Sequence, residues 1–127
     1  MKKFESKSEY IRYVKDRTKK FGVQIIKISE VMPKNTASFV IQKQLIRCAT
    51  SVGSNYRAAC RAKTNPDFIY KMSIVEEEAD ESIYWMEVII EAGLLGADKL
   101  EWVMKEAEEL LRMTVAAINT AKRQKKE

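Results

Sequence analysis

The chain contains no histidine, few glycines and prolines, and only two cysteines, and each shortage narrows what the protein can be. The lack of histidine excludes most general acid–base schemes and most zinc sites. Cys48 and Cys60 are expected to be small buried residues in a reducing cytoplasm, with a disulfide as the alternative. Four glycines, two prolines and long stretches of Ala, Leu, Ile, Glu, Lys and Met indicate a mainly helical protein.

Long apolar runs are also missing. No segment approaches the roughly 20 consecutive apolar residues that a membrane span needs, so we expect no membrane partner. The N-terminus carries lysines but no apolar run behind them, and a signal peptide is therefore not expected. A chain of 127 residues supports one domain, 1–127, with a core of its own. These features together predict a cytoplasmic, single-domain protein.

Acidic residues are absent between Met32 and Asp67, where all six charged side chains are cations. The following segment, from Asp67 to Ala97, contains eight carboxylates and one lysine, Lys71. The net charge of +5 therefore hides a +6 segment followed by a −7 segment. Charge sorted in this way predicts a basic surface that meets a polyanion or an acidic partner.

Proline, glycine and asparagine divide the chain into four segments, which predict helices at about 8–32, 36–62, 66–92 and 98–122. Ser8 and Asp98 are predicted to be N-caps. Within each segment apolar residues recur at spacings of three and four, so each helix has one apolar seam. We therefore predict an all-α, antiparallel up-down-up-down four-helix bundle. The basic tail 122–126 is expected to fray, with an auxiliary polyanion contact as the alternative.

The predicted helix 36–62 has two informative faces beside its apolar seam. The outermost face, here called the basic stripe, has no apolar member and four cations: Lys43, Arg47, Thr50, Ser54, Arg57 and Arg61. The neighbouring face, here called the small-residue flank, consists of Gln44, Cys48, Ser51, Asn55, Ala58 and Ala62. Small residues let another backbone approach, so this flank predicts contact with a helix of the same bundle or of another subunit, with a half-exposed flank that has no partner as the alternative.

The predicted helix 66–92 repeats this pattern with the opposite charge. Its outermost face, here called the acidic stripe, consists of Glu77, Asp80, Tyr84, Glu87 and Glu91. Beside the acidic stripe, Glu78 and Glu81 interrupt an apolar strip that includes Trp85. Because buried carboxylates are costly unless they are paired, we expect Glu78 and Glu81 to accept hydrogen bonds from Ser51, Asn55 or an arginine.

Catalytic chemistry has little support in the sequence. Bundle di-iron sites need a glutamate and a Glu-x-x-His motif, each supplied twice. The spacing from Glu78 to Glu81 fits half of such a site, but no histidine and no second half are present, so no metal or cofactor is expected. No glycine-rich phosphate loop and no activated serine or cysteine is found, which argues against an enzyme.

The second and third segments resemble a known bacterial family. The segments 44–47, 50–55, 62–74 and 78–86 carry its Gln-Leu, Ser-Val-Gly-x-Asn, Phe-Ile and Glu-x-x-Tyr-Trp elements in order. This is the "four helix bundle protein" family, which includes proteins encoded within intervening sequences of 23S rRNA genes. It also includes the accessory variability determinants of diversity-generating retroelements. The motif match spans about 44–95, and the outer helices agree only in pattern.

The resemblance implies a four-helix subunit, a ring-like homopentamer and no known catalytic activity. For the retroelement members it implies a basic surface that binds nucleic acid and a reverse transcriptase. The positions that occupy the family motif, for which it implies structural or interface roles, are Gln44, Ser51, Asn55, Glu78, Glu81 and Trp85. Arg57, Glu77 and Asp80 depart from the family pattern and make the second helix more basic and the third more acidic.

Two functions from different classes follow. The first is an oligomeric, non-enzymatic scaffold whose Lys43, Arg47, Arg57 and Arg61 contact RNA or DNA phosphates with little sequence preference. The second is a protein–protein adaptor in which the basic stripe meets an acidic helix and nucleic acid plays no part. The aromatic residues are expected on packing seams rather than among the cations, so contacts to individual bases are not predicted.

Overall fold

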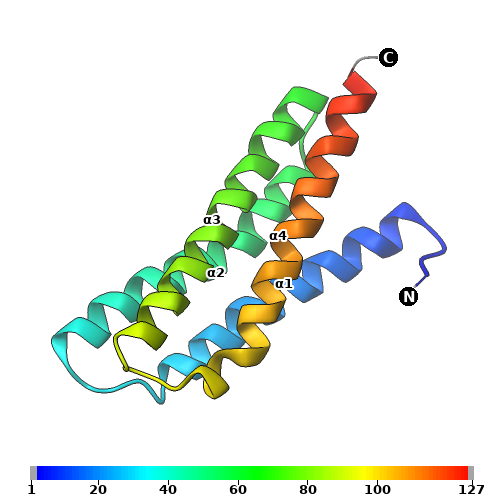
Figure 1. Cartoon of the computed structure of the whole chain (residues 1–127). Helices are drawn as coiled ribbons and strands as arrows, with labels where there is room; N and C mark the ends of the chain where they lie inside the picture. Colours follow the sequence, from blue (N-terminus) through cyan, green and yellow to red (C-terminus); the bar gives the residue numbers. More distant parts are fainter. Residues whose placement is uncertain (1–2, 126–127) are drawn as a thin grey trace.

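The computed structural model describes residues 3–125, which form four α-helices joined by short connections. The helices are α1 (Lys7–Ser29), α2 (Thr36–Cys60), α3 (Asn65–Glu91) and α4 (Ala97–Lys125). They run alternately up and down, so the predicted all-α antiparallel bundle is confirmed (Figure 1). In the described part of the chain, none of these helices combines the length and apolarity needed to cross a membrane.

Polar side chains fix the starts of the first three helices, because each accepts a backbone N–H that the first turn leaves unpaired. These caps are Ser6, Asn35 and Thr64. The prediction of Ser8 as a cap was wrong, since Ser8 lies inside the first turn of α1. Ser6 accepts the N–H of Glu9 at 3.1 Å, and the Glu9 carboxylate accepts the N–H of Glu5 at 2.9 Å. The spacing Ser-x-x-Glu from Ser6 to Glu9 is a capping-box signal, and it favours Ser6 over Ser8 as the N-cap.

The junction between α3 and α4 also differs from the prediction. Gly93 has φ +71°, the left-handed conformation in which glycine commonly follows a helix end. Asp98 is not an N-cap, because α4 already begins at Ala97 and Asp98 lies in its first turn. The Asp98 carboxylate is still favourable there, because it lies near the positive end of the helix dipole. The tail 122–125 continues α4 rather than fraying, whereas residue 126 lies outside the described residues.

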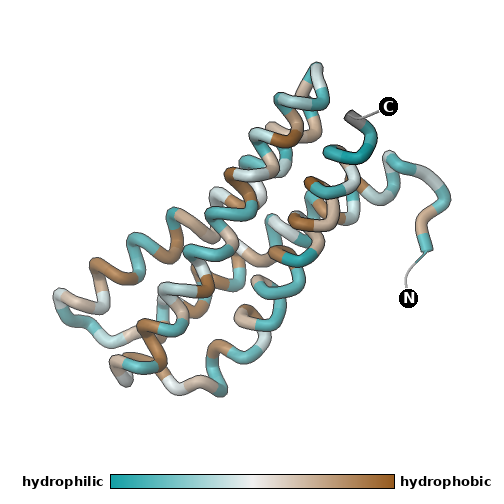
Figure 2. The backbone as a smooth tube through the Cα atoms, turned by 45° about the horizontal axis from the view of Figure 1, so that its top comes forward, coloured by the Kyte–Doolittle hydropathy of each residue, from teal (hydrophilic) through white to brown (hydrophobic). Residues whose placement is uncertain are grey.

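The predicted apolar seams meet in one core. Figure 2 shows hydrophobic and hydrophilic residues alternating along every helix, as the spacing of three and four requires. Fully buried side chains come from all four helices and include Phe21, Val52, Met86 and Val103. Leu100 and Ile118 of α4 are buried as well.

The four helices do not contact one another equally. α1 crosses α2 closely: Gly22 lies beside Thr50, and Gly53 lies beside Thr18, so added side-chain carbons would make contacts of 3.3 Å. By contrast, α1 contacts α4 far less than the other neighbouring helices contact each other. The first turns of α1 lie away from the C-terminal half of α4 (Figure 1). Neither the spacing of apolar residues nor the helix-breaking residues predicted this divergence.

Candidate nucleic-acid interface

All six members of the basic stripe are solvent-exposed, as the helical spacing predicts; five lie on α2, and Arg61 is the residue that follows its end. Within residues 3–125, the side chains of Lys43, Arg57 and Arg61 make no hydrogen bond or ion pair. Thr50 and Ser54 turn their hydroxyls back to α2 carbonyls, to Ile46 at 2.7 Å and to Ser51 at 3.3 Å. The stripe is therefore an open surface with three unpaired cations, spread over about 27 Å at 1.5 Å per residue.

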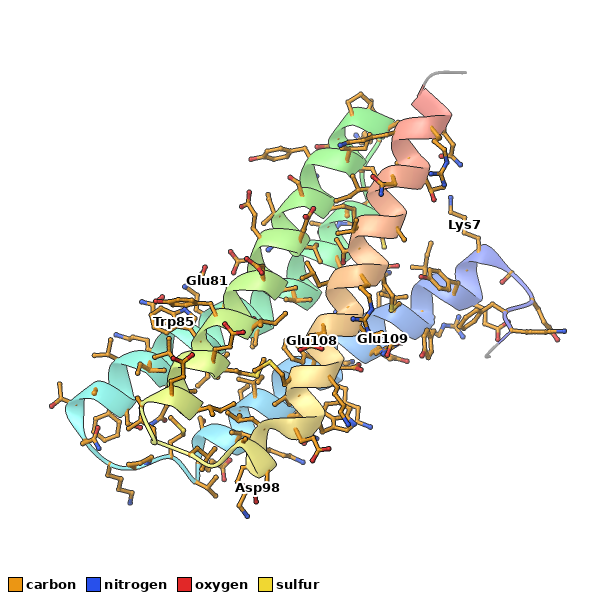
Figure 3. The ribbon with its side chains drawn as sticks, in the orientation of Figure 1. Lys7, Glu81, Trp85, Asp98, Glu108 and Glu109 are labelled. Carbon is orange, nitrogen blue, oxygen red and sulfur yellow. The ribbon has the colours of Figure 1, made fainter. Side chains whose placement is uncertain are left out.

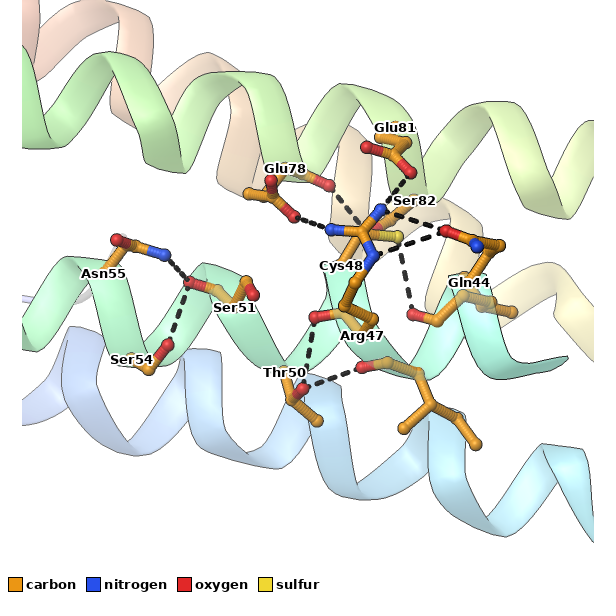
Figure 4. Close-up of polar contacts among 12 residues, drawn as sticks. Gln44, Arg47, Cys48, Thr50, Ser51, Ser54, Asn55, Glu78, Glu81 and Ser82 are labelled. Carbon is orange, nitrogen blue, oxygen red and sulfur yellow. Dashed lines mark hydrogen bonds and ion pairs between the residues drawn. The ribbon is translucent and has the colours of Figure 1, made fainter. Parts of the chain in front are cut away.

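Arg47 differs from the other cations of the stripe, because its guanidinium reaches across to α3. Nη1 donates to Glu78 Oε2 at 3.2 Å, and Nη2 forms an ion pair with Glu81. Nε and Nη2 also donate to Gln44 Oε1, both at 3.3 Å. Figure 4 shows the guanidinium held between the two carboxylates and the amide. The expected contact between these carboxylates and an arginine is confirmed, and it lies within one subunit.

The two carboxylates of α3 occupy different environments. The Glu78 side chain is 17% exposed, and its burial raises the pKa of the carboxyl while the Arg47 charge opposes that rise. Glu81 is 35% exposed and accepts a second hydrogen bond, from Trp85 Nε1 at 3.0 Å. Glu81 and Trp85 lie one turn apart on the same side of α3 (Figure 3). Gln44, Arg47, both glutamates and Trp85 thus form one network that joins α2 to α3.

Ser51 and Asn55 do not pair with Glu78, contrary to one of the expected alternatives. Asn55 Nδ2 donates instead to the Ser51 carbonyl at 2.9 Å, within α2. Cys48 of the small-residue flank is fully buried and accepts a hydrogen bond from Ser82 of α3 at 3.3 Å, whereas the other five members of the flank are half-buried. Burial raises the pKa of the Cys48 thiol. Both cysteines are free, although Cys60 is only partly buried.

An exposed aromatic side chain lies beside the basic stripe, which the sequence analysis did not predict. Phe39 is 55% exposed near the start of α2, four residues before Lys43. The expectation that aromatic residues lie only on packing seams was therefore wrong. The outward position of Phe39 could have been predicted from the sequence, because Phe39 continues the 39, 43, 47, 50 spacing of the outer face.

Two further features were missed because they depend on how α1 packs. The backbone N of Lys19 lies 3.5 Å from the position of a Cβ on Gly53, so Lys19, which is exposed, lies where α1 crosses α2. Arg17 joins α1 to α4 through two hydrogen bonds to Glu106, at 2.7 and 2.8 Å, and an ion pair with Glu109 at 3.0 Å. The hydrogen bond to Glu106 is the main reason that the pKa of Arg17 is raised.

Comparison with known proteins identifies the family of this chain. A family model described as 23S rRNA-intervening sequence protein matches residues 12–116, which include all of α2 and α3. A solved structure with TM-score 0.79 and 30% identity covers 86% of this chain and 97% of its own. It is a protein of unknown function from the S23 ribosomal protein family of Bacteroides thetaiotaomicron. No curated protein matches the chain. The chain therefore belongs to the 23S rRNA-intervening sequence protein family.

Proposed function

We propose that the protein is a non-enzymatic, oligomeric scaffold that binds nucleic acid through the basic stripe of α2. The observation that supports this function is the exposure of Lys43, Arg57 and Arg61 without any intramolecular partner among residues 3–125. A cation that no carboxylate neutralises is available for a phosphate, and its binding releases counterions from the nucleic acid.

Arg47 has a different role in this proposal. Its guanidinium is already shared by Glu78, Glu81 and Gln44, so it offers little free charge to a phosphate. The exposed Lys19 of α1 adds a further cation, because α1 and α2 cross closely at Gly53. The proposed binding surface therefore consists of Lys43, Arg57 and Arg61, with Lys19 at its edge.

The test is binding of labelled RNA and DNA 20-mers, measured by fluorescence anisotropy across a salt series. A variant with Lys43→Gln, Arg57→Gln and Arg61→Gln should bind at least about 10-fold more weakly at low salt. The slope of log K against log salt should shrink by about 2 to 3, since about three phosphate contacts are lost. The matched control removes three exposed cations of α4, with Lys99→Gln, Lys105→Gln and Arg112→Gln. Equal losses in both variants would show a net-charge effect and contradict a role for the stripe.

Self-association is part of the proposal, and its basis is the family resemblance, which implies a ring-like homopentamer. Native mass spectrometry at micromolar concentration should give a mass of several subunits of 14.7 kDa each. A monomer under those conditions would contradict the oligomeric scaffold. Repeating the basic stripe in each subunit would raise avidity, because later contacts form at high effective concentration.

The acidic stripe supports a second candidate function, a protein–protein adaptor. Its carboxylates on α3, Glu77, Asp80, Glu87 and Glu91, are exposed and make no ion pair within residues 3–125. In this case the α2 triple variant would lower the oligomer mass or weaken binding to an acidic partner protein. Nucleic-acid binding would be absent in the unmodified protein, so the same two measurements separate the candidates.

A further inference from the structure

The first turns of α2 expose two large apolar side chains next to the basic stripe. Phe39 is 55% exposed and Val40 is 56% exposed, whereas most large apolar residues of the bundle are buried or partly buried. Phe39 precedes Lys43 by four residues, which places the ring and the ammonium group on the same face of the helix. Exposed apolar residues that occur singly are normal on a protein surface, so a binding role for Phe39 depends on the cations beside it.

The outward position of Phe39 is fixed by its neighbours. Asn35 caps α2 by accepting the N–H of Ser38 at 2.9 Å. Ser38 is fully buried, and its hydroxyl accepts a hydrogen bond from Gln42 Nε2 at 2.8 Å. Because successive helical residues are rotated by about 100°, a buried Ser38 directs the next side chain away from the core. The Phe39 ring is therefore presented by an ordered helical turn.

Along α2 itself, the charged residues nearest Phe39 are cations, which suit an anionic partner with flat apolar groups. No acidic residue occurs between Glu30 and Asp67 along the chain, while Lys43 lies one turn away. A nucleic-acid strand offers both chemistries, since its phosphates suit the cations and its bases have apolar π-faces. Duplexes hide those faces inside the stack, whereas unpaired bases can stack on an aromatic ring.

We propose that the basic stripe binds single-stranded rather than duplex nucleic acid, with the Phe39 ring as a stacking platform for an unpaired base. This inference rests on the proposed nucleic-acid function and adds the class of ligand. Lys43 and Arg57 hold the backbone of the strand, and Phe39 holds a base at the end of the stripe nearest the α1–α2 connection. Stacking on a π-face does not discriminate strongly among bases, so little sequence preference is expected.

The experiment compares three DNA probes by fluorescence anisotropy at one salt concentration. They are a 12-nucleotide oligo-dA, an abasic strand of the same length and a blunt 12-base-pair duplex. The unmodified protein should bind oligo-dA more tightly than either the abasic strand or the duplex. Phe39→Ala should weaken oligo-dA binding about 5- to 150-fold, the effect of losing one stacked base. Binding of the abasic strand and of the duplex should not change.

Two variants serve as controls. Tyr84→Ala removes an equally exposed aromatic side chain, 55% exposed, from the acidic stripe of α3, and should leave all three affinities unchanged. Phe39→Trp should keep oligo-dA binding, and the fluorescence of the new indole should be quenched by oligo-dA but not by the abasic strand. Circular dichroism should show unchanged helix content, because the Phe39 side chain is largely outside the core.

The outcomes separate the stacking inference from the function on which it rests. Equal binding of oligo-dA and duplex, unaffected by Phe39→Ala, would overturn stacking and leave phosphate binding intact. Equal weakening of all three probes by Phe39→Ala would assign Phe39 to assembly or folding, and would also overturn the inference. If no probe binds the unmodified protein while an acidic protein does, the proposed nucleic-acid function itself fails.

Discussion

Arg47 shows how one side chain can change the interpretation of a surface. Its place in the helical spacing put it among the phosphate-binding candidates, and it is indeed exposed. A long side chain, however, can reach a neighbouring helix from an outer position, and Arg47 reaches Glu78 and Glu81. The sequence revealed the carboxylates that needed a partner, because they interrupt an apolar strip. It left three possible donors open, since side-chain reach depends on how the helices are placed.

Two arginines of the basic stripe should differ in how much they contribute to the free energy of unfolding. Arg47→Met should lower the free energy of unfolding by about 1 kcal/mol, because it leaves the mostly buried Glu78 carboxylate without its cation. Arg57→Met removes the same charge from a position without partners and should change that free energy by no more than about 0.5 kcal/mol. Urea denaturation followed by circular dichroism measures both.

This pair of variants also bears on nucleic-acid binding. Arg57→Met should weaken it, whereas Arg47→Met should affect it less, since Arg47 is engaged by α3. Equal stability of the two variants would show that the network around Arg47 contributes nothing measurable. In that case Arg47 would be available to bind phosphates, like the other cations of the stripe.

Individual helices were the most predictable part of the fold. The spacing of three and four identified the seams because burial on a helix follows its 3.6-residue period, and the seams of α2 and α3 are buried almost throughout. Helix ends were less predictable, as Ser8 and Asp98 show, because a cap depends on where the backbone leaves the helix. The close crossing of α1 and α2 at two glycines was not predicted, since no local pattern says which helix lies opposite Gly53.

That crossing gives the prediction at the scale of elements. A Cβ on Gly53 would lie 3.4 Å from the backbone carbonyl carbon of Thr18, so a larger side chain must push α1 away from α2. Gly53→Leu should therefore destabilise the protein by about 1 to 3 kcal/mol, the usual range for overpacking. The neighbouring Ser54→Leu puts the same side chain on the exposed face and should cost far less.

Thermal unfolding of these two variants, together with the unmodified protein, checks the crossing directly. A loss confined to Gly53→Leu is the expected result, because leucine has a higher helix propensity than glycine and only packing can make the change unfavourable. If both leucine variants unfold at the same temperature as the unmodified protein, the helices do not pack as closely as the two glycines allow.

At the scale of the molecule, the four helices form one bundle that is less complete at one end. α1 diverges from α4 towards its N-terminus, beyond the link that Arg17 makes to Glu106 and Glu109. A cleft of about 760 Å³ lies there, lined among others by Tyr10, Tyr56 and Phe68. Lys7, at the first position of α1, lies far from the turns that carry Glu108 and Glu109 (Figure 3). Such long-range divergence cannot be read from a repeat that describes each helix separately.

The divergence predicts uneven stability along α1. Residues 7–13 have almost no buried side chain, whereas Val14, Thr18, Phe21 and Ile25 lie in the core. Local opening costs little free energy where few apolar contacts are lost, so the amides of the first turns should exchange hydrogen much faster than those after Val14. Native-state hydrogen exchange measured by NMR resolves this difference, with the amides around Ala79 of α3 as the slow reference.

The concentration dependence of that exchange tests whether a second copy of the chain covers this end of the bundle. If a neighbouring subunit covers the open end of the bundle, protection of residues 7–13 should rise with protein concentration, while protection around Ala79 stays constant. Fast exchange at every concentration would show that no other copy of the chain contacts this end. Any self-association would then have to use another surface, such as the charged stripes. Uniformly slow exchange along α1, even in the monomer, would contradict the divergence of α1 from α4, because the first turns would then need buried contacts that they lack here.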